Sequence, residues 1–443
     1  MAGEWREMTV GEIVAPVRNG LVGGPFGSNL VSRDYVPAGV PVIRGQNMGA
    51  RWVAGEFAFV SDAKAETLDA NIARPGDIVF TQRGTLGQVS VVPEVPYGRY
   101  VVSQSQMKLT VNRELADPLF FYYVFSSLEQ RDYIRQNTIQ TGVPHTNLGI
   151  LRGTPVPLPP LPEQCAIAHI LGTLDDKIEL NRRMNETLEA MARALFKSWF
   201  VDFDPVRAKT EGRDPGLPKP LADLFPDRFE DSELGEIPAG WRVGNVGELS
   251  MLSRDGINPG EFPNEAFDHF SIPAFDEGQK PKSELGSTIK SNKFVVPPDA
   301  VLLSKLNPRI PRIWFPVVRD NHRAVCSTEF LVTLPRTGIS REFLYSFLSS
   351  EAFADVFEML VTGTSGSHQR VRPEGLLGMD AVIPTESVIH QFTKVTRPML
   401  ARVAHARVES SVLANLRDTL LPKLISGELR VQAADDFVQE ATA

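Results

Sequence analysis

The chain repeats itself at about half its length, which restricts it to folds that two similar halves can build. Trp5 and Arg6 near the start recur as Trp241 and Arg242, at an offset of 236 residues. The offset then settles at 223, where GDIVF (76–80) aligns with DAVLL (299–303), QSQMKLTV (104–111) with STEFLVTL (327–334), and PLFFYYVFSS (118–127) with REFLYSFLSS (341–350). The first two pairs have the pattern of strands and the third is typical of helices. Each half is therefore predicted to be a mixed α/β domain.

A heptad pattern closes each half. Residues step by alternating fours and threes, which is the spacing of a coiled-coil seam, and the same seam recurs 225 residues later. Two matching long helices are predicted, and because each ends a repeated half, antiparallel pairing across a pseudo-twofold axis is favoured. The main seam residues are Leu171, Leu174, Ile178, Leu188, Leu195 and Trp199 in the first half, and Met399, Val403, Leu413, Leu420 and Leu424 in the second.

Three residues qualify this seam. Asn181 and Asn185 are expected to set its register, although Asn185 could instead face solvent. Pro398 should either kink the second helix or mark its true start.

The first helix, predicted over 163–200, would be roughly 57 Å long at about 1.5 Å per residue. That exceeds one turn of B-DNA, about 34 Å, so such a rod suits two similar domains that read separate half-sites on one duplex.

The charge of the chain is unevenly distributed. The formal net charge is -8, which by itself argues against a protein coated for nucleic acid. The segment 201–240 contributes -5 and the residues from 426 onward contribute -3, so the remainder is neutral. Within that remainder, residues 300–325 carry one acid and five basic side chains: Lys305, Arg309, Arg312, Arg319 and Arg323. They predict a local basic strip, and the alternative is a solvated loop with incidental arginines.

The segment 201–240 is rich in proline and acid and has no sustained period. Two roles remain open for it: a plain tether or a docking segment for a partner. Its apolar residues exceed what an unattached tether requires. These residues are Leu221, Leu224, Phe225 and Phe229.

Composition and motifs argue against several classes of protein. With 42% apolar and 23% charged residues the chain should be globular. The longest apolar stretch, 119–125, is far shorter than the roughly 18 residues of a membrane helix, and no targeting segment is found, so a cytoplasmic protein without membrane contact is expected. The two cysteines have no CxxC partner and the histidines no HxxxH or HExxH spacing, which predicts no metal site. The Asn/Asp-Pro-Pro-aromatic motif of an adenine methyltransferase is missing, so no catalytic residue is predicted.

The segment 157–209, which begins PLPPLPEQCAIAHILGTLDDKIEL, closely resembles the central conserved region of specificity subunits of type I restriction-modification systems. GGPFGSNL (23–30), GVPVIRGQNM (39–48), RPGDIVFTQRGTLGQ (74–88) and LISGELRV (424–431) resemble other recurring stretches of that family. The resemblance implies two target recognition domains separated by the paired helices. The implied parts are domain one at 1–160, a long helix at 161–200, the linker 201–240, domain two at 241–385, a second helix at 386–426 and a tail at 427–443.

The resemblance also implies a role. Each domain would read one half of a bipartite, asymmetric sequence in double-stranded DNA, and the helices would act as a ruler. The subunit would not be catalytic, and would hold two adenine-methyltransferase subunits and recruit restriction subunits that translocate DNA. S-adenosylmethionine, ATP and magnesium would be bound by those partners and not by this chain. Two rival hypotheses are a coiled-coil adapter that binds no DNA and a self-contained nuclease or methyltransferase.

The residues expected to contact DNA are polar or basic side chains in loops, because such side chains read base edges in the major groove. Alternatives stay open: Gln46 and Asn47 could cap turns, His145 and His368 could be satisfied loop histidines, and Arg44 could pair with an acid. Lys305 to Arg312 is the preferred stretch, because folding alone hardly explains so many basic side chains. The candidates are Ser28, Asn29, Arg44, Gln46, Asn47, Arg83, Thr85, Ser103, Gln104, Thr141 and His145 in the first half, and Lys305, Asn307, Arg309, Arg312, Arg323, Thr364, Ser367, His368, Gln369 and Arg370 in the second.

Overall fold

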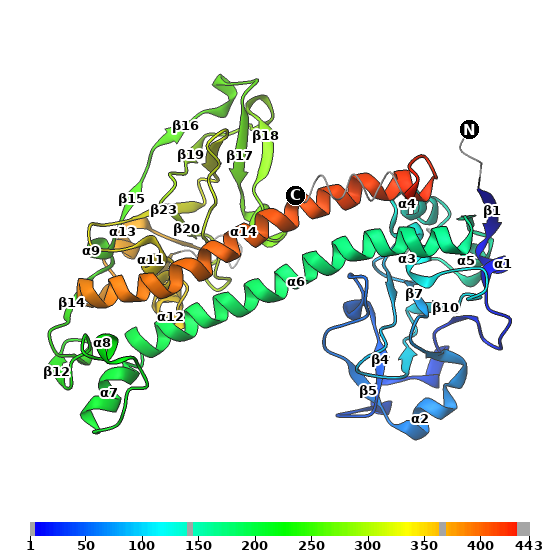
Figure 1. Ribbon diagram of the computed structural model, residues 1–443, viewed down its shortest axis with the longest axis horizontal. Helices are drawn as coiled ribbons and strands as arrows, with labels where there is room; N and C mark the ends of the chain where they lie inside the picture. The colour runs from blue at the N-terminus through cyan, green and yellow to red at the C-terminus, as the bar shows by residue number, and fades with distance from the viewer. Residues whose placement is uncertain (1–4, 140–144, 363–368, 432–443) are drawn as a thin grey trace. The chain divides into compact units, whose positions relative to one another are not determined.

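The computed structural model describes residues 5–139, 145–362 and 369–431. The chain divides into two units (Figure 1). Unit 1 comprises residues 1–178 and 412–443, and unit 2 comprises residues 179–411. Each unit buries a core of its own, built from strands, short helices and one stretch of each of two long helices.

Unit 1 contains a four-stranded sheet, a five-stranded sheet and a two-stranded sheet. The four-stranded sheet has the order β2 (Leu21–Gly23), β10 (Gln106–Leu109), β7 (Ile78–Thr81) and β8 (Val89–Val91). The five-stranded sheet has the order β3 (Tyr35–Val36), β5 (Ala58–Val60), β4 (Val40–Ile43), β9 (Tyr100–Val102) and β6 (Ile72–Ala73). The strand β1 (Arg6–Thr9) pairs with β11 (Pro155–Leu158), and the short helices are α1 (Val10–Ile13), α2 (Asp62–Thr67), α3 (Pro118–Ser126), α4 (Leu128–Gln136) and α5 (Leu148–Gly153).

Unit 2 repeats these sheets. Its four-stranded sheet has the order β15 (Ser250–Ser253), β23 (Phe330–Pro335), β20 (Val301–Ser304) and β21 (Ile313–Trp314). Its five-stranded sheet has the order β16 (Gly256–Ile257), β19 (Lys293–Val295), β22 (Arg323–Cys326), β17 (Ala266–Phe270) and β18 (Lys282–Leu285). The strand pairs are β14 (Arg242–Asn245) with β26 (Asp380–Ile383) and β24 (Val361–Thr362) with β25 (Arg370–Val371), and the helices are α9 (Val246–Leu249), α10 (Ile272–Asp276), α11 (Arg341–Leu348), α12 (Glu351–Met359) and α13 (Pro373–Leu377).

The mixed α/β prediction and the duplication are confirmed. Strands β7 and β20 begin 223 residues apart, as do helices α3 and α11. Each five-stranded sheet has one parallel pair, β4 with β9 and β17 with β22. The fifth strand differs, because β3 joins the β5 edge in unit 1 whereas β16 joins the β19 edge in unit 2.

The two long helices are also confirmed. Helix α6 runs from Leu161 to Phe200 and helix α14 from Glu386 to Ile425, with 40 residues each. Within unit 2 their contacts run in opposite directions, since Asn181 bonds Ser410 at 3.2 Å while Trp199, further along α6, packs on Phe392. The pairing is antiparallel, and the predicted seam residues are buried or half-buried: Leu171, Leu174, Ile178, Leu188, Leu195, Trp199, Met399, Val403, Leu413, Leu420 and Leu424.

Two details of the seam differ from expectation. Helix α14 begins twelve residues before Pro398 and continues through it, so the suggestion that this proline marks the helix start is wrong. The chain accommodates it because its exposed ring does not enter the seam. Asn185 is only 9% exposed, so the alternative in which it faces solvent is also wrong.

The segment 201–240 is not a tether. It forms α7 (Asp204–Thr210), α8 (Lys219–Ala222) and a hairpin of β12 (Phe229–Ser232) with β13 (Gly235–Pro238). Phe203, Val206 and Phe225 are buried in the core of unit 2, where Phe203 and Trp241 lie edge to face at 5.7 Å. Proline and acid content concealed an ordered segment because a few aromatic anchors are enough to bury it.

Candidate nucleic-acid interface

Five loops of unit 1 meet beside its four-stranded sheet. They are residues 24–29, 44–47, 82–87, 103–105 and 145–147. Backbone bonds join them: Gln82 N donates to Ser105 O at 2.7 Å, Ser103 N to Ile43 O at 3.0 Å, Thr146 N to Gln82 O at 3.0 Å and Gly24 N to Gln106 O at 2.8 Å. The structure therefore brings together the candidate residues of unit 1, which the sequence spreads over more than a hundred positions.

The turn after β2 presents Ser28 and Asn29 to solvent. Gln104 fixes this turn, because its Nε2 donates to Gly27 O at 2.8 Å and to Leu30 O at 3.0 Å. Gly24 allows the close approach of the two loops, since a Cβ there would lie 1.8 Å from the carbonyl oxygen of Ser103. Ser103 itself is half-buried and bonds the side chain of Gln106. Ser28 and Asn29 are accessible to a ligand, whereas Gln104 and Ser103 hold the turn.

The loop after β4 contains three candidates with different environments. Asn47 is buried and its Nδ2 donates to Ala54 O at 3.1 Å and Glu56 O at 2.8 Å, so the turn-capping alternative describes it. Gln46 donates to Glu56 O at 3.0 Å but remains exposed. Arg44 forms no ion pair with any acid in the described part of the chain, and its Nε is buried there without a partner.

Arg83 and Thr85 are exposed on the loop after β7. Arg83 pairs through its backbone with His145, in an isolated antiparallel bridge. Among described residues 5–139 and 145–362, no carboxylate forms an ion pair with Arg83, so its charge faces solvent. His145 has a bonding partner and is half-buried, which agrees with the satisfied-histidine alternative. Thr141 lies outside the described residues.

Unit 2 repeats the same backbone scaffold with different side chains. Lys305 N donates to Glu329 O at 3.0 Å, and Val371 N donates to Lys305 O at 3.0 Å. These bonds correspond, at offsets of 223 to 225, to those that Gln82 forms with Ser105 and Thr146. The isolated bridge between Leu306 and Arg370 likewise corresponds to the bridge between Arg83 and His145.

The basic strip 300–325 is not an unpaired positive surface, because acids from outside the strip pair with most of its members, and contact of its residues with DNA stays a prediction. Arg312 is buried and grips Asp276 with two bonds of 2.7 and 2.9 Å. The other pairs are Arg319 with Asp268, Arg323 with Glu265 at 3.1 Å and Arg309 with Glu358 at 2.8 Å. Each of these four arginines thus has an acidic partner within unit 2. Lys305 is the member of the strip that forms no ion pair with a described acid.

Arg370 is held by a carboxylate next to Lys305. Its Nε and Nη2 donate to the two oxygens of Glu329, both at 2.9 Å. Hydrogen bonds from Arg370 lower the pKa of Glu329, so the pair stays ionised at neutral pH. Asn307 adopts a left-handed backbone with φ of 49° and donates its N–H to Gln369 O at 3.0 Å, which places this pair of loops together. Thr364, Ser367 and His368 lie outside the described residues.

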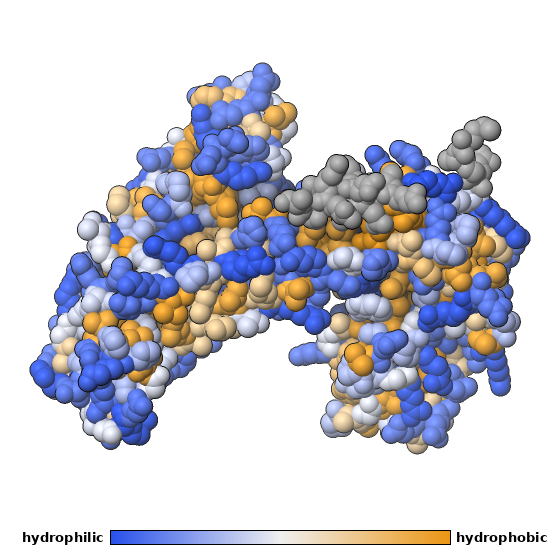
Figure 2. All heavy atoms as spheres, viewed as in Figure 1, coloured by the Kyte–Doolittle hydropathy of each residue, from blue (hydrophilic) through white to orange (hydrophobic). Residues whose placement is uncertain are grey.

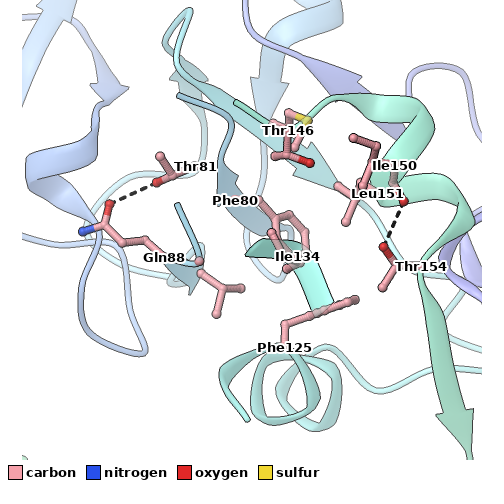
Figure 3. Close-up of a pocket in the computed structure, with 12 residues that line it drawn as sticks. Phe80, Thr81, Gln88, Phe125, Ile134, Thr146, Ile150, Leu151 and Thr154 are labelled. Atoms are coloured by element: carbon pink, nitrogen blue, oxygen red, sulfur yellow. Dashed lines mark hydrogen bonds between the residues drawn. The ribbon is translucent and has the colours of Figure 1, made fainter. Parts of the chain in front are cut away.

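Two hollows lie near the candidate loops. Beneath the loops of unit 1, a cavity of about 10 Å³ is lined mainly by apolar side chains such as Phe80, Phe125 and Ile134, and it has room for about one water molecule (Figure 3). In unit 2 a groove of about 300 Å³ is lined by residues that include Phe294, Phe330 and Lys305. Among the residues that the structure describes, no three His, Cys, Asp or Glu side chains gather as a metal site requires.

Sequence reasoning missed Gln82, Ser105 and Glu329. The 223-residue offset, continued through the loops, aligns Gln82 with the candidate Lys305. Ser105 and Glu329 lie 224 apart and hold the same place in the scaffold. The internal repeat, and not the residue type, is the sequence feature that identifies these positions.

The two units define a duplicated recognition protein: each builds one loop scaffold, and the same positions carry different polar groups. Comparisons with known proteins agree. Residues 4–190 match the sequence model of the type I restriction modification DNA specificity domain. The chain is 24% identical to the type I restriction enzyme HindI specificity subunit of Haemophilus influenzae, over 96% of this chain and 100% of that protein.

Further relatives extend the likeness. The MjaIX specificity subunit of Methanocaldococcus jannaschii is 22% identical over 84% of this chain and 82% of its own length. Among solved structures, the type I restriction-modification system S subunit from M. genitalium has the same fold, with a TM-score of 0.57, 16% identity and coverage of 95% and 96%. Residues 4–190 thus resemble the DNA specificity domain, and the whole chain is similar to type I restriction enzyme specificity subunits. The resemblance drawn from the sequence is confirmed.

None of the helices in residues 5–139, 145–362 and 369–431 combines the length and apolarity needed to cross a bilayer.

Proposed function

We propose that the chain is the DNA sequence-specificity subunit of a type I restriction-modification complex. Each unit reads one half of a bipartite, asymmetric site in double-stranded DNA. The observation that carries this proposal is the shared loop scaffold, which presents Gln82, Arg83 and Ser105 in unit 1 and Lys305, Arg370 and Glu329 in unit 2. Because base edges are distinguished by their pattern of donors and acceptors, scaffolds with unlike side chains should read unlike sequences.

The subunit acts without catalysing a reaction itself. Partner subunits supply chemistry: two methyltransferase subunits bind S-adenosylmethionine and methylate adenine, and restriction subunits bind ATP and magnesium. The long helices offer a surface for partners, because apolar side chains reach solvent along α6 (Figure 2). Leu180 is 59% exposed and Met191 49%, and Val408 on α14 is 45% exposed. Such exposed apolar side chains at helical spacing are typical of docking sites for further helices.

The test is co-expression of the chain with an adenine methyltransferase subunit, followed by single-molecule mapping of methylated adenines. A single bipartite motif is expected. Methylation that follows no motif, or a motif of one continuous half, would contradict the proposal. The same experiment without this chain is the control, since the methyltransferase subunit alone should leave the motif unmodified.

Salt distinguishes a DNA reader from an adapter that binds only proteins. A complex that neutralises several phosphates should bind duplex DNA with an affinity that falls by about 0.9 log unit per contact for each log unit of salt. Binding of the assembled complex that is absent or unaffected by salt would favour the adapter.

A further inference from the structure

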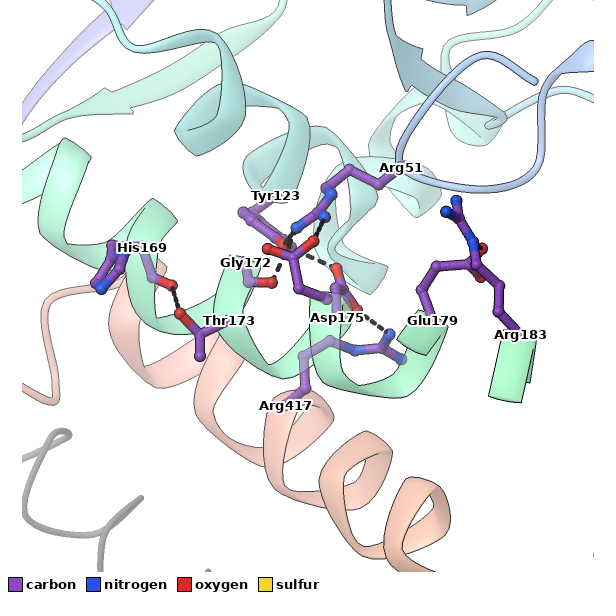
Figure 4. Close-up of polar contacts among 10 residues, drawn as sticks. Arg51, Tyr123, His169, Gly172, Thr173, Asp175, Glu179, Arg183 and Arg417 are labelled. Atoms are coloured by element: carbon purple, nitrogen blue, oxygen red, sulfur yellow. Dashed lines mark hydrogen bonds and ion pairs between the residues drawn. The ribbon is translucent and has the colours of Figure 1, made fainter. Parts of the chain in front are cut away.

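A buried polar network joins four elements of unit 1 (Figure 4). Arg51, from the loop before β5, donates through Nη1 to Gly172 O of α6 at 3.0 Å and through Nη2 to Asp176. Tyr123 of α3 donates its hydroxyl to Asp175 Oδ2 at 2.7 Å. Arg417 of α14 donates to the other oxygen of Asp175, also at 2.7 Å. The carboxylate of Asp175 on α6 thus accepts one hydrogen bond from the domain helix α3 and one from the second long helix, α14.

The network is nearly closed to solvent at its centre. The Arg51 side chain is 9% exposed and that of Asp175 14%. Burial and the neighbouring carboxylate of Asp175 raise the pKa of Tyr123, so its phenol stays protonated and remains a donor. Hydrogen bonds of this charge-assisted kind fix direction as well as distance. Gly172 allows the approach of Arg51, since a Cβ there would stand 3.2 Å from its Nη1.

Arg51 also belongs to the loop that carries DNA-reading candidates. Asn47 joins the two ends of this loop, because Ala54 N donates to Asn47 O at 3.1 Å and Asn47 Nδ2 returns a bond to Ala54 O. Between them, Val91 N of β8 donates to Arg51 O at 2.7 Å, and Ser90 Oγ donates to Ala50 O at 2.8 Å. Hydrogen bonds therefore connect the stretch from Arg44 to Ala54 within itself and to β8.

Unit 2 lacks this arrangement at the equivalent positions. The counterparts of Tyr123, Asp175 and Arg417, at offsets of 223 to 225, are Ser346, Leu400 and Ala192. Leu400 and Ala192 are buried apolar side chains, and Ser346 bonds its own helix at Glu342 O. A network restricted to one copy of a duplicated fold is not required by the fold itself.

We propose that Arg51, Tyr123, Asp175 and Arg417 form a positioning device for DNA readout, which fixes the loop 44–54 of unit 1 against the long helices. These are positioning residues, since they act through Arg44 and Gln46 and do not touch DNA. The inference rests on the proposed function. It predicts that loosening the network impairs recognition of one half-site and leaves the other unchanged.

The experiment uses the complex of the full chain with its methyltransferase partner. Exchange of residues 1–150 for those of a relative first assigns the half-site that unit 1 reads. Methylation rates are then measured on duplexes with one mismatch in either half-site, for Tyr123→Phe, Arg51→Lys and the matched surface control Arg135→Lys. Tyr123→Phe preserves the packed ring and removes the bond to Asp175. Arg51→Lys preserves the charge near Asp176 but loses the fork that also reaches Gly172.

Tyr123→Phe and Arg51→Lys should each lower discrimination in the unit 1 half-site roughly tenfold, the ratio expected for one charge-assisted hydrogen bond, and leave the other half-site and the control unchanged. Equal losses in both half-sites, or unchanged discrimination despite a lower melting temperature, would overturn the positioning role. If Arg51→Lys fails to fold, the milder Tyr123→Phe decides. A wild-type complex that follows no bipartite motif would overturn the proposed function as well, and is recognised before any variant is compared.

Discussion

The four-stranded sheets of units 1 and 2 have the same strand order, but the loops beside them carry different charges. In unit 1 the exposed loop candidates are mostly amides and hydroxyls beside Arg83, which forms no ion pair with a described acid. In unit 2 the corresponding loops carry Lys305 and the paired charges of Arg370 and Glu329. Backbone bonds are preserved at matching positions while the side chains have diverged. The two copies therefore share a backbone scaffold, whereas the side chains that would contact a ligand differ between them.

The units also differ in how charge is used for stability. In unit 2, two arginines form ion pairs within the domain: Arg312 with Asp276 and Arg319 with Asp268. Both units also join the domain to a long helix through arginines, but at different positions: Arg51 and Arg417 act on α6 in unit 1, whereas Arg397 of α14 pairs with Glu342 of α11 in unit 2. A count of basic residues along the sequence could not separate these uses, because the acidic partners come from distant segments.

The largest expected effect is on the target sequence. Exchange of residues 1–150 for the matching segment of a relative should replace one half of the methylated motif and leave the other half unchanged, because each unit has its own loops and core. Single-molecule mapping of methylated adenines measures this directly. Changes in both halves would mean that the units do not read independently. Exchange of residues 241–385 is the reciprocal control.

A second test asks whether the arginines of unit 2 are structural. Arg319→Met should lower the free energy of unfolding by about 3 kcal/mol, since it leaves Asp268, with a side chain only 1% exposed, without its guanidinium partner. Arg309→Met is the matched control from the same strip. Its pair with Glu358 is exposed on both sides, so a loss below about 1 kcal/mol is expected. Urea unfolding followed by tryptophan fluorescence provides the measurement, because Trp199, Trp241 and Trp314 are buried in unit 2, and equal losses would contradict the distinction.

A third test compares the two reading sites. Arg83→Ala should weaken binding of the complex to its DNA by about 1–3 kcal/mol and relax specificity at one position of the unit 1 half-site. Arg370→Ala should do the same in the other half-site. If either residue contacts phosphate instead, specificity should persist while the salt dependence falls by about one contact. Arg135→Ala, on the exposed face of α4, is the control and should change neither.

Much of the fold could be predicted because periodicity and repetition are written directly in the chain. The heptad seam gave both long helices within a few residues of their ends, and the 223-residue offset matched strands and helices of the two units. The folded state of segment 201–240 could not be predicted, since Phe203 and Phe225 become core residues only when Trp199 and Trp241 are near. The roles of the arginines were hidden for the same reason: ion pairs join residues far apart in sequence.

The smallest effect concerns the helix seam, which is polar in unit 2. The Oδ1 atoms of Asn181 and Asn185 are both buried and have no donor within the described residues, but Asn181 also donates through Nδ2 to Glu409 at 3.0 Å and to Ser410 at 3.2 Å. Asn185→Leu should therefore stabilise unit 2 by about 1 kcal/mol, and Asn181→Leu should destabilise it by a similar amount, because only the second change removes bonds that are made. Urea midpoints of the two variants give the comparison. If both substitutions stabilise the protein, the bonds of Asn181 do not offset the free-energy cost of burying it. Both asparagines would then serve only to fix the register of α6 against α14.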